Sequence, residues 1–213
     1  MNKKIFEDKN FNVVGKIVPY EHFKIFCDNP GGFKINPEHY GTLISRAEGL
    51  LEKNYPMLIA SDYMMYKRDG NRSIYELKYM ERRQDILIFT LAEHVERKNR
   101  FTDHIINLMW MLLEETTWVI PAHNHPKKDV NTCLPYSFSR EVDYFDLFSA
   151  MTGACVALVY HLMKDTFDSV TSIINERIIY ELERRLIEPY LNDVDMIEHL
   201  WWSGFRGNRV NNW

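Results

Sequence analysis

The side chains with the most evident chemistry gather in the last thirteen residues of the sequence. Among its residues are three indoles, two guanidinium groups and a consecutive pair of carboxamides: Trp201, Trp202, Arg206, Arg209, Asn211, Asn212 and Trp213. Indole faces can stack on a sugar ring, and guanidinium and amide donors suit a carboxylate. The combination predicts a site for a ring-shaped anion such as a uronic-acid sugar. The alternative is a solvated tail, with the Trp pair serving only to pack a helix.

A second group of candidates lies in a proline-containing segment, TWVIPAHNHPKKDVNTCLPYSF, over 117–138. Its His123 and His125 form an H-x-H pair with Asp129 nearby, and imidazole and carboxylate groups could together hold zinc or a related ion. A loop of this length in a compact domain is more often functional than idle. We expect His123 and Trp118 to line a ligand groove, with a metal at His123 and His125 as the alternative. The sequence predicts no cofactor.

Helices must position these candidates, because helical periodicity accounts for most of the chain. Apolar residues recur by three and four between recognisable start and stop signals. The predicted helices span roughly 37–55, 57–65, 73–96, 102–115, 140–163 and 167–187, and a short last helix carries the Trp pair. Almost nothing is typical of a strand. The predicted fold class is all-α, with helical hairpins packed as a bundle or curved into a toroid.

Short polar motifs indicate how these helices begin. Asn36 before Pro37 predicts the first start, and Ser73 with Glu76 matches a capping box for the third. Asp146, beside the apolar face of its helix, is predicted to cap or brace the preceding loop. Paired arginines in two helices are explained as helix-face ion pairs with nearby acids. These residues are Arg82 and Arg83 beside Glu81, and Arg184 and Arg185 beside Glu181 and Glu183.

Composition limits the classes of partner. The 213 residues carry a net charge of -4 and are 46% hydrophobic, which favours one compact domain and argues against a nucleic-acid binder. Cys27, Cys133 and Cys155 are too few and too far apart for a disulfide framework. Neither a signal peptide nor an apolar run of about 20 residues is recognisable. We therefore expect no membrane partner and a cytoplasmic location, or a periplasmic or secreted one if a signal was removed.

Several segments, taken in order, resemble the heparinase II/III-like polysaccharide lyases. They are TWVIPAH at 117–123, DLFSAMTGACVALVYHLM at 146–163, LERRLIEPYL at 182–191, then WW and NNW. The resemblance spans about residues 37–213. It implies an α/α toroid over 37–213, preceded by an irregular segment over 1–36. Members of the family carry a large β-sandwich after the toroid, so the resemblance implies that this toroid is incomplete and its sandwich absent.

The resemblance also implies an activity, β-elimination of a uronic-acid polysaccharide such as a heparin-, heparan- or alginate-type glycan. In that family an Asn-Asn-His run neutralises the uronate carboxylate, and a later Tyr acts as acid or base. Asn212 matches the second Asn and Asn211 precedes it, whereas Trp213 stands where the alginate-lyase branch has His. No tyrosine follows the motif, so we expect this chain alone to be inactive. Tyr136 and Tyr144 are catalytic candidates only through their nearness to the long loop.

Two function classes therefore remain open. The first is the toroid portion of a polysaccharide lyase, whose partner is an acidic polysaccharide or oligosaccharide. The second is a non-catalytic helical module that binds a carbohydrate or a protein. An incomplete toroid would expose apolar helix faces, so the sequence also predicts self-association into a homo-oligomer.

Overall fold

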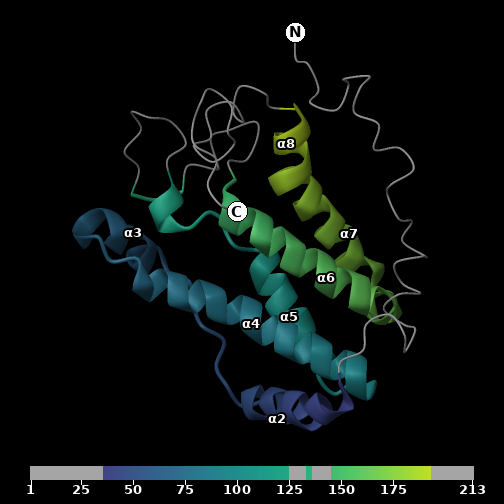
Figure 1. The fold of residues 1–213 in the computed structure, drawn as a ribbon. Helices are drawn as coiled ribbons and strands as arrows, with labels where there is room; N and C mark the ends of the chain where they lie inside the picture. Colours follow the sequence, from purple (N-terminus) through teal and green to yellow (C-terminus); the bar gives the residue numbers. More distant parts are fainter. Residues whose placement is uncertain (1–35, 125–132, 136–144, 193–213) are drawn as a thin grey trace.

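The computed structural model describes residues 36–124, 133–135 and 145–192, and within these ranges the fold is all-α, as predicted. Figure 1 shows two long helices, α4 and α6, crossing the molecule, with shorter helices on either side. The α-helices are α2 (Tyr40–Leu50), α3 (Ala60–Asp69), α4 (Ser73–Glu96), α5 (Thr102–Leu113), α6 (Leu147–Val170), α7 (Ser172–Leu182) and α8 (Glu188–Asn192). Short helical turns are η1 (Pro37–His39), η2 (Pro121–His123) and the π-helical η4 (Glu183–Ile187).

Of the two helix starts predicted from polar motifs, the structure confirms the one at Asn36 and contradicts the one at Ser73. Asn36 caps η1, since its side-chain oxygen accepts a hydrogen bond from the backbone N–H of Glu38 at 3.2 Å, and η1 leads directly into α2. The capping box at Ser73 is wrong. The side chain of Asn71 instead accepts from the N–H of Ile74 at 3.2 Å, and Glu76 turns back to bind Arg72 at 2.9 Å.

The two helices predicted at 140–163 and 167–187 are displaced toward the C-terminus. Asp146 caps α6, so this helix begins only at Leu147, and it continues without a break to Val170. Thr171 adopts an extended conformation, ends α6 and caps α7 with its own side chain. The helical path then continues through η4 into α8, past the Pro189 that was expected to end it. The short helix predicted for the Trp pair lies outside the described residues.

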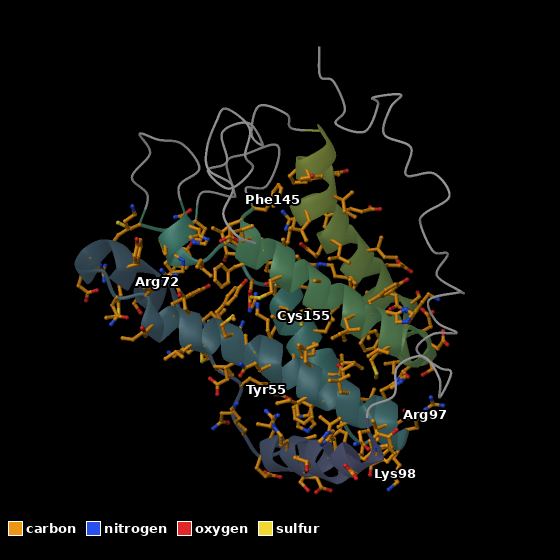
Figure 2. All side chains as sticks on the ribbon, viewed as in Figure 1. Tyr55, Arg72, Arg97, Lys98, Phe145 and Cys155 are labelled. Carbon is orange, nitrogen blue, oxygen red and sulfur yellow. The ribbon has the colours of Figure 1, made fainter. Side chains whose placement is uncertain are left out.

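One apolar core holds the helices together. α4 packs against α2, α5 and α6, and α6 packs in turn against α7. Figure 2 shows side chains from these helices filling the space between the ribbons, with Cys155 of α6 near the centre. Fully buried members include Ile86, Phe89, Phe101, Ile105, Leu112, Val156, Val159 and Phe167. A second, smaller cluster of Tyr63, Tyr75, Tyr79 and Ile120 lies at the other end of α4.

α6 approaches its neighbour closely and is unusually apolar. A Cβ added at Gly153 would overlap the Cδ1 atom of Leu186, so the glycine permits η4 to pack directly on α6. By length and composition, α6 is also apolar enough to cross a membrane, a criterion that core helices of globular proteins pass as well. It contributes Thr152, Val156, Val159 and Phe167 to the interior of the described bundle.

Candidate functional site

A buried ion-pair network joins the first half of α4 to the end of α5. Glu115, two residues beyond α5, accepts hydrogen bonds from Arg82 at 3.2 Å and from Arg83 at 2.6 and 3.1 Å. The side chains of Arg82, Arg83 and Glu115 are only 8%, 5% and 3% exposed. Buried charges are tolerated when they are paired and hydrogen-bonded. The three groups carry two positive charges and one negative charge, so the network keeps an excess positive charge.

Tyr79 and Thr152 extend this network to α6. The Tyr79 hydroxyl lies 2.6 Å from Thr152 Oγ1 and 2.9 Å from the carbonyl oxygen of Trp118. Arg83 donates to Thr152 Oγ1 at 2.9 Å, and its guanidinium lies 3.2 Å from the centre of the Tyr79 ring. We call Tyr79, Arg82, Arg83, Glu115 and Thr152 the polar centre. It ties α4, the residues after α5 and the start of α6 into one unit.

Arg185 of η4 brings a third segment to the same place. Its guanidinium donates to the carbonyl oxygens of Glu115 at 2.8 Å and Leu113 at 3.2 Å, and lies 5.0 Å from the Trp118 ring centre. Glu181 of α7 accepts from Arg185 at 2.6 Å. Because these carbonyls belong to the last residue of α5 and to the residue two positions beyond it, Arg185 satisfies acceptors at the C-terminus of the helix.

His123 and Asp146 form a pair at the edge of this arrangement. His123 Nδ1 lies 2.8 Å from Asp146 Oδ2, and the Asp146 side chain is fully buried whereas that of His123 is 16% exposed. The other carboxylate oxygen, Oδ1, accepts from the backbone N–H of Ser149 at 2.7 Å and from its hydroxyl at 2.8 Å. Asp146 therefore caps α6 and orients the imidazole with the same carboxylate.

This pairing decides which ring nitrogen of His123 can act on a ligand. A carboxylate accepts hydrogen bonds, so Nδ1 carries the proton when the imidazole is neutral, and Nε2 carries the lone pair. A histidine oriented in this way is of the type that takes part in general acid–base catalysis. The pair can therefore serve as a general base or as a hydrogen-bonding contact to a ligand.

Burial and ion pairing shift the pKa values of four groups in and around the polar centre. Burial raises the pKa of Tyr79 and Tyr75 well above the usual range of a phenol, so both hydroxyls stay protonated. Burial alone would lower the pKa of Arg83, but the Glu115 carboxylate outweighs it and raises the pKa above its ordinary value. Burial also raises the pKa of the Cys155 thiol to about 11. These groups position others and do not exchange protons near neutral pH.

The predicted site residues fall into three groups. His123 is 16% exposed at its side chain, and its groove-lining role stays a prediction. Trp118 is a core residue, 2% exposed, and its indole N–H donates to the Leu112 carbonyl at 2.9 Å, so its ring faces no groove here. The other predicted residues lie outside the described residues: His125, Asp129, Tyr136, Tyr144, Trp201, Trp202, Arg206, Arg209, Asn211, Asn212 and Trp213. Within the described ranges, no group of three potential metal ligands occurs.

The arginine pairs correct the interpretation from sequence. Arg82 and Arg83 are buried and bind Glu115, rather than forming surface ion pairs with Glu81. For Arg184 and Arg185 the predicted pairing with Glu181 is confirmed, at 2.7 and 2.6 Å, although Arg185 is buried. The useful signal in the sequence is that Arg82 and Arg83 continue the face of Tyr75 and Tyr79. A cation on a buried helix face predicts a buried acid elsewhere in the chain.

Comparison with protein-family models gives no match for this chain, and no curated protein matches its sequence.

Proposed function

We propose that this chain is the helical part of a protein that binds uronic-acid polysaccharides and supports their cleavage by β-elimination. The supporting observation is the convergence of the three described segments that resemble heparinase II/III-like lyases. Segment 117–123 meets segment 146–163 through the His123–Asp146 pair, at 2.8 Å. Segment 182–191 meets 117–123 where Arg185 lies over the Trp118 ring. Residues far apart in sequence thus build one local structure around a partly exposed histidine.

The proposed reaction assigns each group a step. A base removes the proton at C5 of the uronate, the C4–O4 bond breaks, a C4=C5 double bond forms, and the leaving oxygen takes up a proton. The negative charge that develops on the carboxylate must be stabilised by donors. Asn212, preceded by Asn211, is proposed to supply that stabilisation. His123, oriented by Asp146, is proposed to contact the saccharide through Nε2. The helical hairpins are proposed to be layers of an α/α toroid.

A binding and cleavage experiment tests this function. The protein is mixed with uronic-acid oligosaccharides and with neutral oligosaccharides of equal length, and binding is measured by calorimetry. Cleavage is followed by the ultraviolet absorbance of the unsaturated uronate product. We expect binding that favours the acidic saccharides and weakens in His123→Ala. We expect absorbance only from a form of the protein extended past Trp213, which can supply the later Tyr, and it should disappear in Asn212→Ala. Binding without absorbance supports a non-catalytic carbohydrate-binding module. Absence of both contradicts the proposal.

A protein-binding module is the second candidate, and exposed apolar side chains on α7 favour it. Ile173 is 58% exposed, Tyr180 55% and Ile179 42%, and Val170 at the end of α6 is 58% exposed. Such side chains often mark an interface when they are contiguous. If the surface binds a second copy of the chain, light scattering will show a dimer that the double variant Ile173→Ser and Tyr180→Ser converts to a monomer. A monomer at all concentrations contradicts self-association.

A further inference from the structure

A pocket of about 390 Å³ lies between the residues before α3 and the end of α5. Leu58, Tyr63, Tyr75 and Met111 form its apolar and aromatic side, and Arg82, Glu114 and Glu115 supply charged groups. Neither His123 nor Asp146 lines it, so it is distinct from the candidate site above. Pockets that bind small molecules measure roughly 300–1,000 Å³, which places this one among those suited to a small ligand.

Arg82 brings an unused donor group to this pocket. Its Nε donates to the Pro56 carbonyl at 2.7 Å and its Nη1 to Glu115 at 3.2 Å. Within the described ranges its Nη2 has no acceptor, although the side chain is 92% buried. Arg83, by contrast, uses all three of its nitrogens on Tyr79, Thr152 and Glu115. Nη2 is not one of the fully buried atoms without a partner, so solvent reaches it and it can donate to a ligand in the pocket.

Tyr75 adds a second donor of the same kind. The residue is 6% exposed and lines the pocket, and its hydroxyl has no hydrogen-bond partner in the part of the chain that the structure describes. The neighbouring tyrosines differ, because Tyr63 donates to the Val119 carbonyl and Tyr79 to the Trp118 carbonyl. Burial raises the pKa of Tyr75, so its hydroxyl stays protonated and can donate.

The charges around the pocket define the ligand further. A guanidinium edge and a hydroxyl together match the two oxygens of a carboxylate. The buried excess positive charge of Arg82 and Arg83 over Glu115 favours such an anion. Glu114 is exposed, so solvent screens its charge, and its carboxylate can accept hydrogen bonds from ligand hydroxyls. The aromatic walls suit a ring.

We propose that this pocket binds a small hydroxylated carboxylic acid of one ring, a free sugar acid, with its carboxylate on Arg82 and Tyr75 and its hydroxyls toward Glu114. This is a second binding site, and it requires neither polysaccharide binding nor cleavage at His123. It would let a monomeric acid bind the same protein alongside a polymeric substrate.

Calorimetric titration with glucuronate tests the proposal, with glucose and inorganic phosphate as comparison ligands. We expect glucuronate to bind at least tenfold more tightly than glucose, because only the acid can accept from the two unused donors. Tyr75→Phe keeps the ring and removes the hydroxyl, and it should weaken glucuronate binding at least fivefold. Tyr66→Phe of α3 is the matched control, since Tyr66 does not line the pocket, and it should change nothing.

Each contrary outcome overturns the proposal. If glucose and glucuronate bind with equal affinity, the pocket does not recognise the carboxylate. If inorganic phosphate binds more tightly than glucuronate, the pocket takes a different anion. If Tyr75→Phe leaves the affinity for glucuronate unchanged, or if glucuronate does not bind at all, the pocket is not the binding site. His123→Ala separates the two sites: retained glucuronate binding supports a separate pocket, whereas its loss places the ligand at His123. Failure of the polysaccharide assay leaves this titration unaffected.

Discussion

Both halves of α4 bury side chains, but different forces hold them in place. In the first half the buried side chains are polar, Tyr79, Arg82 and Arg83 among them, and they bind through directed hydrogen bonds. In the second half Ile86 and Phe89 pack in the apolar core against α5, on a helix that also buries Asp85, Thr90 and Glu93. Apolar packing adapts to small changes of shape, whereas a buried polar network requires every partner. The first half of α4 also lies beside the segments that resemble the heparinase II/III-like lyases, and it contributes Tyr75 and Arg82 to the pocket.

This difference has a functional meaning. Two buried cations on one acid are a poor means of stabilising a helix, because apolar side chains of similar volume often do as well or better. We therefore expect the apolar packing of the second half to tolerate small changes of shape, and the polar first half to require each of its partners. If this division is correct, substitutions in the two halves will differ in size, in their response to compensating changes and in pH dependence.

The largest effect is expected from Glu115→Ala. It leaves Arg82 and Arg83 buried without their carboxylate, which should lower the free energy of unfolding by about 3–5 kcal/mol. Urea unfolding followed by circular dichroism measures it. Glu114→Ala, at the exposed neighbouring position, is the control and should stay within about 0.5 kcal/mol of the parent protein. A loss below about 1 kcal/mol at Glu115 would show that the network contributes no specific pairing.

A compensating variant sharpens the comparison. Replacing the charged groups together, by Arg82→Met, Arg83→Met and Glu115→Leu, removes the unpaired charges along with their partner. We expect it to regain about 2 kcal/mol or more of the stability lost in Glu115→Ala, because the desolvation penalty disappears. No recovery in urea unfolding would mean that the loss comes from hydrogen bonds to Tyr79 and Thr152 rather than from unpaired charge.

Deleting a single group in either half of α4 should lower the free energy of unfolding by less than Glu115→Ala does. Tyr79→Phe removes the hydroxyl shared by Trp118 and Thr152 and should destabilise by about 1–3 kcal/mol, since buried acceptors lose their donor. Ile86→Val removes one methylene from the apolar half and should cost about 0.5–1.5 kcal/mol. Thermal unfolding compares the two variants. A larger loss for Ile86→Val than for Tyr79→Phe contradicts the division of the helix.

Acid should weaken the polar side of the molecule through Glu181. Burial tends to raise its pKa, but hydrogen bonds from Arg185 and Arg184 outweigh this and lower the pKa below its ordinary value of 4.5. The unfolded chain then binds more protons in acid, so this contribution to stability is present above about pH 4.5 and is lost as the pH falls through the folded pKa. Unfolding free energies measured against pH should show this slope, reduced in Glu181→Gln. If the unfolding free energy of Glu181→Gln depends on pH as steeply as that of the parent protein, other carboxylates cause the dependence.

The smallest effect is expected from a chemical probe of Cys155, which lies in the core beside the middle of α4. Cys155 lies 3.9 Å from the carbonyl oxygen of Arg83, and burial raises its pKa to about 11. In a Cys27→Ser background, a disulfide reagent at pH 8 should label the exposed Cys133 quickly and Cys155 only on unfolding. Mass spectrometry identifies the labelled residue. Rapid labelling of Cys155 in the folded protein would mean that the centre of the bundle opens readily.

The sequence predicts the helices better than it predicts the site. α4 is predicted with its exact bounds, because its apolar spacing continues over many turns. The start of α6 was placed too early, since a buried Asp146 decides it and periodicity alone does not report which acid is a cap. The polar centre was missed, because Glu115 is 32 residues from Arg83 and local spacing cannot reveal that pair. Trp118 was assigned to a groove on residue type, whereas its environment is the core.

The most direct test of the account is whether the His123 imidazole contacts a uronate. The ring resonances of His123 are followed by NMR while a uronic-acid disaccharide is added to the protein and to Asp146→Asn. Asparagine still caps a helix, so α6 should persist while the imidazole loses its negatively charged partner. We expect saturable shifts of the His123 resonances in the parent protein with the uronic-acid disaccharide, and none with a neutral disaccharide. We also expect the uronic-acid disaccharide to bind Asp146→Asn more weakly. Unchanged His123 resonances with saturating uronate would contradict it.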